Sequence, residues 1–408
     1  MADDLPQGLA LTPLDPGFND DMHSRLDHVR ATCPVMRDEQ LGAVIVTREV
    51  DVKAVLADRT LGADPRKSLP DALSRLYANC PPGMEAEYTP SMLFADDPDH
   101  GRLRRLVSKA FTPRAVDATL PIVEAEADRL IDAMIAKGGE IDLIAEFAGP
   151  LPTVVIAHML GVETARMGDF KRWSDALVFA LSLVKPPELV EKVEAAGEAM
   201  SGYFHEMIAK RRARPGEDLI SAMIRAEDDD ERLTDDQIVQ LCNLLLTAGN
   251  VTTTDLIGNG VHALLSNRAQ WERLSDDPSL AENAVEEVLR YDSPVITAAR
   301  IPHADFELGD VEIENGRTIV TSLAAANHDP AVHDNPHLFD IGRMKPRHHS
   351  FGGGIHFCLG APLARAEGAI AFRKLAERLP HLTLGTTPNV RRTLPGFHGF
   401  ETMWVKVP

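Results

Sequence analysis

A ten-residue stretch near the C-terminus constrains this chain more than any other. It reads Phe351-Gly352-Gly353-Gly354-Ile355-His356-Phe357-Cys358-Leu359-Gly360. Three successive glycines allow a backbone without Cβ atoms to lie beside something bulky and flat. Pro362 and the apolar face that follows it predict a helix beginning at Cys358 and ending before Pro380. The pattern therefore indicates that Cys358 is a ligand.

A cysteine at a helix N-terminus faces unpaired backbone N–H groups, which favour the thiolate and predict a lowered pKa for Cys358. A thiolate can serve as a nucleophile, a redox partner or a metal ligand. A redox pair or a zinc knuckle needs a second cysteine close by, but Cys33, Cys80 and Cys242 are scattered over the chain. A single thiolate beside a glycine-rich platform fits an axial haem ligand, although a lone cysteine is usually an ordinary buried residue.

Residues 351–360 resemble the haem-binding loop of the cytochrome P-450 superfamily, specifically its soluble bacterial haem-thiolate monooxygenases, with the pattern F-x-x-G-x-H-x-C-x-G. Further family motifs occur in the family's order: His100 with Arg104, Ala248-Gly249 with Thr252, Glu287 with Arg290, and Arg343. The resemblance covers essentially the whole chain. It implies one mainly helical domain, residues 1–408, shaped as a triangular prism with a smaller β region.

The resemblance also implies a cofactor, haem b, between the long central helix and the helix that follows Cys358. Cys358 would bind the iron. The other residues implied to bind the cofactor are His100, Arg104, Arg300, Phe351, His356 and Gly360. By its residues alone, a helical pair such as His100 and Arg104 is more often a solvated face. Glu287, Arg290 and Arg343 are implied to form a structural triad behind the haem rather than to take part in catalysis.

Several segments receive a role from the resemblance. A Pro-rich loop at 60–95 would cover the substrate, and helices within 165–212 would form a lid. A capping box from Thr234 to Gln237 predicts the longest helix, 235–266, which would be the oxygen-binding helix. Asn315-Gly316 predicts a hairpin turn between strands around 311–313 and 318–322.

The middle of the long predicted helix contains Gly249 and four β-branched residues, 251–254, which are poor choices for helix stability. The resemblance implies that Ala248 and Gly249 shape the oxygen pocket and that Thr252 manages protons. The acid that the family pattern has at position 251 is replaced by valine.

This replacement leaves three hypotheses for the protons. They arrive through Asp255 or through water passing Asn250, they arrive slowly so that peroxide leaks, or the oxidant is peroxide itself. The presence of Thr252 favours the first.

The substrate pocket is expected to include the residues that the resemblance places near it: Leu93, Leu244, Val251, Val295, Ile296, Thr297 and Phe397. Few of them are aromatic. They favour a compact aliphatic, terpenoid or steroid-like substrate.

The charge of the chain indicates which kinds of partner it can bind. The net charge of −20 argues against nonspecific nucleic-acid binding and against attraction to an anionic membrane. Residues 101–114 nevertheless contain Arg102, Arg105 and Lys109 and no acidic residue. With the resemblance, we expect a ferredoxin-type electron donor to dock there; without it, a chance cluster is an equal interpretation.

The sequence also indicates where in the cell the protein is located. The N-terminus lacks a signal-peptide pattern, no stretch has the apolar length of a membrane span, and the cysteines show no disulfide framework. We therefore expect a cytoplasmic monomer.

The segment Asn327-His328-Asp329-Pro330 follows the family's N-R-D-P with histidine in place of arginine. Of the 15 histidines, most beyond His100 and His356 are expected at the surface.

The expected reaction is insertion of one atom of O₂ into a C–H or C=C bond of a small apolar substrate. Electrons would come from NAD(P)H through a separate reductase and ferredoxin, because the chain length leaves no room for a fused reductase. Two alternatives are a peroxide-driven haem-thiolate peroxygenase and a non-catalytic haem carrier or sensor.

Overall fold

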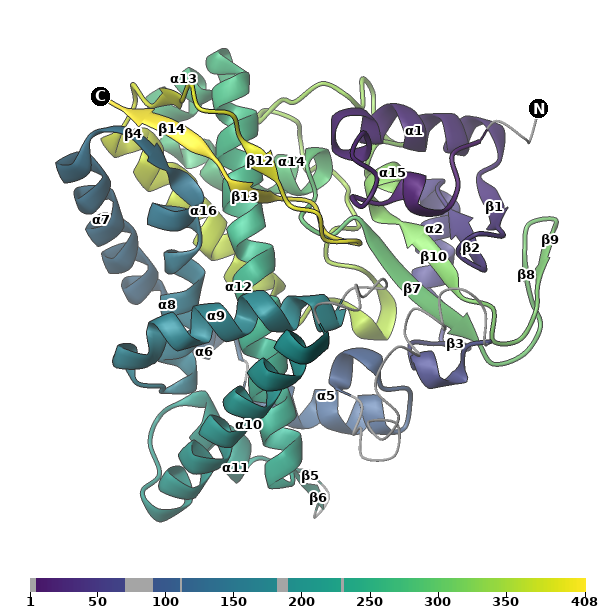
Figure 1. Ribbon diagram of the computed structural model, residues 1–408, viewed down its shortest axis with the longest axis horizontal. Helices are drawn as coiled ribbons and strands as arrows, with labels where there is room; N and C mark the ends of the chain where they lie inside the picture. Colours follow the sequence, from purple (N-terminus) through teal and green to yellow (C-terminus); the bar gives the residue numbers. More distant parts are fainter. Residues whose placement is uncertain (1–4, 70–90, 111, 182–189, 229–230) are drawn as a thin grey trace.

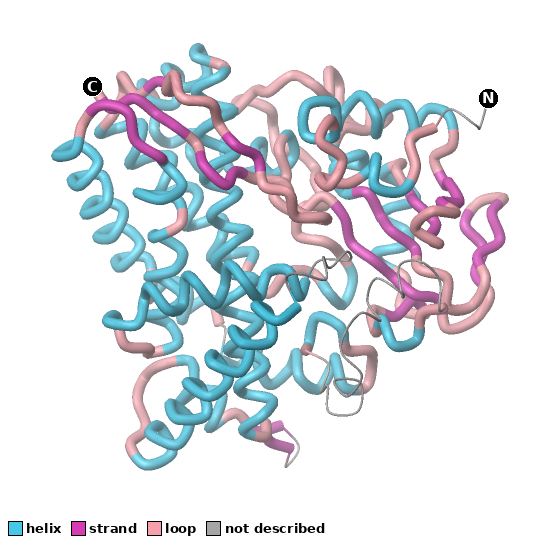
Figure 2. Tube along the Cα trace, viewed as in Figure 1, coloured by secondary structure: helices cyan, strands magenta, loops and turns pink. Residues whose placement is uncertain are grey.

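The computed structural model describes residues 5–69, 91–110, 112–181, 190–228 and 231–408. Helices make up most of it. The largest group of strands lies on the right of the view in Figure 1 and Figure 2, and a smaller group lies at the upper left. A mainly helical fold with a smaller β region is what the sequence predicts. No helix within the described ranges combines the length and the apolar character needed to cross a membrane.

The long helix α12 (Asp235–Ser266) crosses the helical part of the molecule and has the predicted bounds. The Thr234 hydroxyl accepts a hydrogen bond from the backbone N–H of Gln237 at 3.2 Å, and the Gln237 side chain accepts one from the N–H of Thr234 at 3.1 Å. These two bonds satisfy backbone donors that a helix start leaves unpaired.

Helices α8, α9, α10, α14 and α16 all contact α12. The contact with α16 is especially close at Gly260, where an added Cβ would lie 2.1 Å from the Phe372 ring. Besides α12, the helices are α1 (Phe18–Thr32), α2 (Glu49–Ala57), α5 (Asp99–Ala110), α6 (Pro113–Asp117), α7 (Leu120–Lys137), α8 (Pro150–Leu160), α9 (Met167–Leu177), α10 (Val190–Ala213), α11 (Leu219–Arg225), α13 (Arg268–Asp276), α14 (Ala281–Tyr291), α15 (Leu323–Asn327) and α16 (Ala361–Arg378).

The principal sheet has the strand order β1-β2-β10-β7-β3. Its strands are β1 (Val35–Asp38), β2 (Ala43–Val46), β3 (Leu61–Gly62), β7 (Thr297–Pro302) and β10 (Ile319–Ser322). Strand β10 runs parallel to β2 and antiparallel to β7, so that Ile319 lies opposite both Val44 and Arg300. All four residues of β10 are buried. The sheet thereby fixes β7, which carries Thr297 and Arg300.

The predicted hairpin turn at Asn315-Gly316 is wrong. Strands β8 (Phe306–Leu308) and β9 (Val311–Ile313) pair with each other across Gly309, while β10 uses its backbone groups in the principal sheet. Asn315-Gly316 instead leads the chain from one sheet to the other. The other short strands are β4 (Gly139–Asp142), β5 (Glu227–Asp228), β6 (Glu231–Arg232), β11 (Thr383–Leu384), β12 (Val390–Arg391), β13 (Phe400–Thr402) and β14 (Trp404–Val407).

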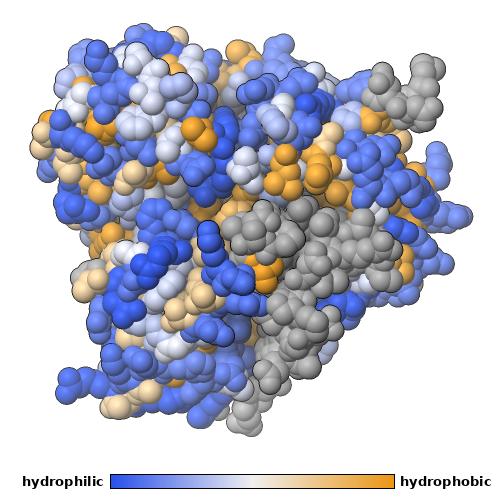
Figure 3. Space-filling model, in the orientation of Figure 1, coloured by the Kyte–Doolittle hydropathy of each residue, from blue (hydrophilic) through white to orange (hydrophobic). Residues whose placement is uncertain are grey.

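The surface seen in Figure 3 is mostly hydrophilic, with hydrophobic residues gathered in patches near its centre. Most histidines beyond His100 and His356 are exposed or partly exposed, as expected, but three are not. His328, His333 and His398 are buried. For His328, ring contacts with neighbouring histidines replace contact with water.

Glu287, Arg290 and Arg343 come together as the sequence predicts. Arg290 donates two hydrogen bonds to the Glu287 carboxylate, at 2.8 and 2.9 Å, and both side chains are fully buried. Arg343 approaches the same carboxylate at 3.3 Å. Arg290 also donates to the carbonyl oxygens of Asn327, Pro336 and Leu338. Loss of one charge would therefore leave another buried without compensation.

This network continues to the loop that carries Cys358. The Asn327 amide donates to the Ser350 hydroxyl at 2.9 Å and accepts from the backbone N–H of His349 at 2.7 Å. Because Arg290 binds the Asn327 carbonyl, the ion pair and the start of the cysteine loop are joined through one residue.

We predict that Glu287→Gln lowers the free energy of unfolding by about 3–5 kcal/mol, because it leaves the Arg290 charge buried and only partly compensated. Urea unfolding followed by circular dichroism measures the change. Glu282→Gln on the same helix is the matched control, since Glu282 is exposed. If the two variants had equal free energies of unfolding, the ion pair would not stabilise the fold.

Candidate functional site

A cavity of about 370 Å³ lies between the middle of α12, strand β7 and the 351–360 loop. It gathers residues from nearly the whole length of the chain. Its lining includes every residue predicted to bind a cofactor (His100, Arg104, Arg300, Phe351, His356, Cys358 and Gly360) together with Ala248, Gly249 and Thr252 of the predicted oxygen-binding helix. The predicted cofactor residues therefore share one site.

The glycines of the loop have a different role from the predicted one. Gly352 lines the cavity, but Gly353 and Gly354 face α2. Gly354 has φ +64°, and a Cβ there would lie 2.2 Å from the carbonyl oxygen of Leu56. Gly352 has φ +68° but has room for a Cβ, with the nearest atom at 3.9 Å. Glycine is required at 354 chiefly because the loop packs against the backbone of α2.

Cys358 faces the cavity three residues before α16 begins. Its own N–H donates to the carbonyl of Phe351 at 2.9 Å, which closes the loop. The prediction of a lowered pKa is wrong. Burial raises the pKa of the thiol, and the N–H groups of Gly360 and Ala361 and the Arg104 charge oppose this effect only in part. Since a metal deprotonates a coordinating thiol outright, a bound metal would convert this thiol to the thiolate.

Four nitrogen-containing side chains gather around the same loop: His100, Arg104, Arg300 and His356. The His100 and His356 rings are 4.2 Å apart, and Arg300 is buried beside them, where it donates to the carbonyl of Gly353 at 3.3 Å. Arg104 donates to the carbonyl of Phe357 at 2.7 Å. Burial lowers the pKa of Arg300 to about 10, and burial together with Arg300 lowers the pKa of His356 to about 3.

His356 Nε2 is buried without a hydrogen-bond partner. An orphaned imidazole nitrogen beside a buried guanidinium fits an anionic ligand that enters the cavity. The residues present thus fit haem, whose iron would meet Cys358 and whose carboxylates would meet this cluster.

Helix α12 presents Ala248, Gly249 and Thr252 to the cavity, as predicted. The Thr252 hydroxyl donates to the carbonyl of Ala248 at 2.7 Å, which satisfies it within the helix. Thr253 also lines the cavity and was missed by the sequence analysis. Its spacing of four residues from Gly249 could have identified it.

The two predicted proton carriers do not line the cavity. Asn250 is buried on another face of α12, where it accepts a hydrogen bond from Thr153 at 2.8 Å. Asp255 is fully buried and pairs with Arg392 at 3.2 Å. Burial raises the pKa of Asp255 to about 6. The geometry does not support direct proton delivery by either side chain.

Of the predicted substrate-contacting residues, Leu93, Leu244, Val295, Thr297 and Phe397 line the cavity, while Val251 and Ile296 do not. Val251 packs against Val178, Leu394 and Phe397. Ile296 is buried with Leu11 and Leu26 on the far side of the sheet, because successive residues of an extended chain point in opposite directions.

The predicted covering segments are present in part. Residues at both ends of the 60–95 loop line the cavity: Ala63, Pro65, Ser68, Met92, Leu93 and Phe94. Residues 70–90 lie outside the described part. The predicted lid, 165–212, corresponds to α9, a turn at Val178–Leu181 and α10, and its described residues do not line the cavity.

Glu367 was also missed. It lies on the inner face of α16, lines the cavity and has one carboxylate oxygen without a partner. Burial raises its pKa to about 8. An acidic residue four positions after Leu363, on a face that is otherwise apolar, was the available signal.

Comparison with protein-family models matches residues 84–389 to the model described as Cytochrome P450. The chain belongs to the cytochrome P450 family. This cytochrome P450 is 41% identical to Cytochrome P450 107B1 of Saccharopolyspora erythraea, over 93% of each chain. It is 39% identical to 6-deoxyerythronolide B hydroxylase of the same organism, over 90% of this chain and 91% of the relative.

Comparison with solved structures gives the same family. CYP164A2 of Mycobacterium smegmatis has a TM-score of 0.88 and 36% identity, covering 98% of this chain and 100% of that one. Bacillus subtilis PksS has a TM-score of 0.87 and 34% identity, covering 97% and 99%. This cytochrome P450 is therefore an oxidoreductase with a haem cofactor and a cysteine thiolate axial ligand. When bound, haem supplies the iron at which O₂ is activated with electrons from a redox partner.

We predict that Gly354→Ala lowers the haem-to-protein ratio of the purified cytochrome P450 much more than Gly352→Ala. Both variants bear the cost of a left-handed backbone, roughly 1–2 kcal/mol. Only Gly354→Ala also brings a Cβ against the Leu56 carbonyl. Haem absorbance relative to total protein measures the effect, and equal ratios for the two variants would contradict the role assigned to this contact.

Proposed function

We propose that this cytochrome P450 is a monooxygenase that inserts one atom of O₂ into a C–H or C=C bond of an apolar, mainly aliphatic substrate, with electrons from NAD(P)H delivered through a separate reductase and ferredoxin. The observation that carries the proposal is the position of Thr252. Its hydroxyl and the small residues Ala248 and Gly249 line the same cavity as the Cys358 thiol. A hydroxyl on this wall can hold and orient water beside the place where O₂ reacts.

The cavity wall supports an apolar substrate. Leu93, Leu244, Val295 and Phe397 contribute apolar surface, and Thr297 contributes a hydroxyl that can orient a polar group. The names of two relatives support this choice: Polyketide biosynthesis cytochrome P450 PksS and Vitamin D(3) 25-hydroxylase, which are 35% and 38% identical to this chain. We therefore favour a polyketide or steroid-like ring system over a fatty acid or a small aromatic compound.

Residues of this chain have separate tasks in the proposed reaction. His100, Arg104, Arg300 and His356 bind the cofactor's carboxylates and fix its orientation. Cys358 would hold the metal. Ala248 and Gly249, which line the same cavity, would leave space for O₂, and Thr252 would position the water through which protons arrive. Because Asn250 and Asp255 are turned away, solvent is the proposed source of these protons.

Valine at position 251 favours one alternative, a peroxide-driven peroxygenase. Val251 is buried among apolar side chains and cannot transfer a proton. An enzyme supplied with peroxide would need fewer protons from its own side chains. Turnover with peroxide alone, at a rate equal to or above that with NAD(P)H and redox partners, would favour this alternative. Cys358→Ser should abolish turnover in both assays.

We propose that the electron donor docks on the face formed by α5 and Phe357. Arg104 on α5 binds the carbonyl of Phe357, so this helix lies beside the residue that precedes Cys358. Arg105 is exposed and Arg102 lies 3.8 Å from Asp99. The side chain of Lys109 lies outside the described part. A cationic face on a chain of net charge −20 suits an acidic ferredoxin.

We predict that Thr252→Ala lowers the amount of product formed per NAD(P)H several-fold while NAD(P)H consumption continues, because water is no longer held on this wall. Product and NAD(P)H are measured together in a reconstituted assay, with peroxide release as a third readout. Thr253→Ala is the matched comparison on the same wall. Unchanged coupling in Thr252→Ala would remove this hydroxyl from the mechanism.

We predict that Arg105→Glu slows association with an acidic ferredoxin at low salt. The difference in association rate between the variant and the unmodified chain should become smaller as salt rises, since exposed charges act mainly on the rate at which the two proteins meet. Stopped-flow reduction at several ionic strengths measures this effect. Lys406→Glu makes the same change of charge on β14, away from α5, and is the control. Equal slowing by both variants would indicate a general charge effect rather than a docking face.

A further inference from the structure

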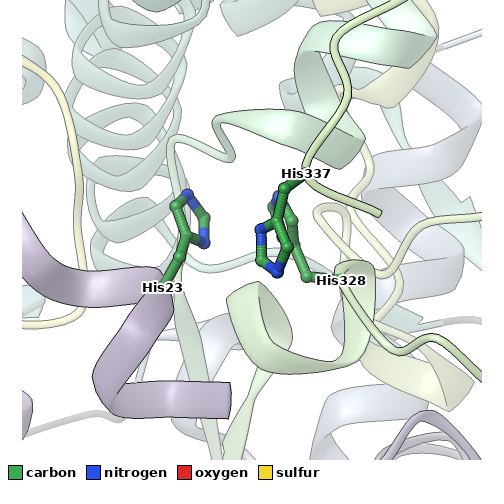
Figure 4. A group of neighbouring side chains, drawn as sticks. All are labelled: His23, His328 and His337. Atoms are coloured by element: carbon green, nitrogen blue, oxygen red, sulfur yellow. The ribbon is translucent and has the colours of Figure 1, made fainter. Parts of the chain in front are cut away.

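Three histidines from separate parts of the chain converge outside the haem cavity (Figure 4). His23 lies on α1, His328 directly follows α15, and His337 lies in the loop beyond it. One ring nitrogen of each lies within 4.8 Å of the corresponding nitrogens of the other two. The ring centroids of His23 and His328 are 4.1 Å apart, and those of His328 and His337 are 5.2 Å apart.

The hydrogen bonds around this cluster, which we call the His23 cluster (His23, His328 and His337), determine which nitrogens are available. His328 Nδ1 lies 3.1 Å from the carbonyl oxygen of Ala324. A carbonyl only accepts, so Nδ1 carries the proton and Nε2 carries a lone pair. That Nε2 is buried and has no hydrogen-bond partner.

His337 is held in a complementary way. Its Nε2 lies 2.6 Å from the Asp27 carboxylate, which leaves Nδ1 as the free lone pair. Asp27 is itself fixed by Arg30 at 2.6 Å. A histidine that donates one ring N–H to a carboxylate or a carbonyl and presents the other nitrogen is the usual arrangement around a bound metal.

Simple packing of neutral rings is the competing interpretation, and the nearly parallel rings of His328 and His337 are compatible with it. Packing leaves His328 Nε2 buried without a hydrogen-bond partner, however, which is unfavourable for a polar atom removed from water. Burial lowers the pKa of His23 to about 4 and that of His328 well below its usual value, so both rings are neutral at pH 7. Neutral imidazole is the form that binds metal.

We propose that His23, His328 and His337 form a binding site for one late first-row divalent cation, with Zn²⁺ as its typical occupant. Three imidazoles suit Zn²⁺, Ni²⁺ or Cu²⁺, whereas Ca²⁺ and Mg²⁺ require oxygen ligands. The side chain of His337 is 49% exposed, so the cation can enter from solvent and keep a water molecule as a further ligand.

The cluster needs only a small adjustment to bind. Zn–N bonds of about 2.0–2.1 Å in a tetrahedral site separate the ligand nitrogens by about 3.3 Å. The rings must therefore approach one another by roughly 1–1.5 Å, given the present limit of 4.8 Å. His23 is partly exposed and His337 is exposed, so both can move toward the buried His328.

The bound cation would have a structural effect. It would tie α1 to the segment 327–338, which contains His328 and His337 and whose carbonyls at Asn327, Pro336 and Leu338 bind Arg290. The site would therefore strengthen the support of the cysteine loop without contact with the haem cavity. It does not depend on the proposed monooxygenase reaction.

The test uses tag-free, haem-loaded protein from which metals have been removed with a chelator. Zn²⁺ is titrated by calorimetry and against a coloured competing chelator, and we expect one site per chain. His328→Arg restores the residue of the N-R-D-P pattern, and His337→Gln changes an exposed side chain. Each should weaken Zn²⁺ binding by at least about tenfold. His28→Gln, exposed on α1, is the control and should bind as the unmodified chain does.

A second readout separates binding at this site from folding defects. The Soret band of each variant confirms an intact haem site. Zn²⁺ should raise the midpoint of thermal unfolding of the unmodified chain and of His28→Gln, but not of His337→Gln, because only a ligand of the native state stabilises it. Failure to bind one equivalent of Zn²⁺, or equal affinity in His337→Gln and His28→Gln, would overturn the proposal.

Discussion

The bidentate ion pair between Glu287 and Arg290 is the interaction on which the rest of the site depends. Both side chains are fully buried, and Arg290 also binds three backbone carbonyls. Removing two charges from water is costly, and the pair is stable only with these additional partners. The same partners fix Asn327, which in turn holds Ser350 and the backbone of His349. Cys358 is therefore placed by a chain of polar contacts that begins with two residues outside the cavity lining.

The cavity itself combines an apolar half with a cationic half. The substrate side is lined mainly by aliphatic residues, whereas His100, Arg104, Arg300 and His356 form the other wall. Arg300 and His356 are held there at some electrostatic cost, as their lowered pKa values show. A cofactor with carboxylates removes that cost when it binds. The cationic wall of the cavity and the carboxylates of haem are therefore electrostatically complementary.

Local sequence signals predicted the elements that have local causes. The capping box at Thr234 gave the bounds of α12, and the motif around Cys358 gave the metal ligand. Residues whose role depends on tertiary contacts were not predicted correctly. Asn250 and Ile296 belong to the expected segments but face away from the cavity, and Asp255 pairs with an arginine more than a hundred residues away. The pKa of Cys358 likewise depends on burial, which no sequence pattern specifies.

The position of Phe357 has a consequence for the surface beside the metal ligand. Its ring is 42% exposed and its carbonyl is bound by Arg104, while the next residue is the metal ligand. The ring is separated from the sulfur by one peptide unit and the Cα and Cβ atoms of the two residues. Covalent bonds alone thus connect this exposed ring to the sulfur, and a substitution at position 357 would change the surface beside the metal ligand without changing the ligand itself.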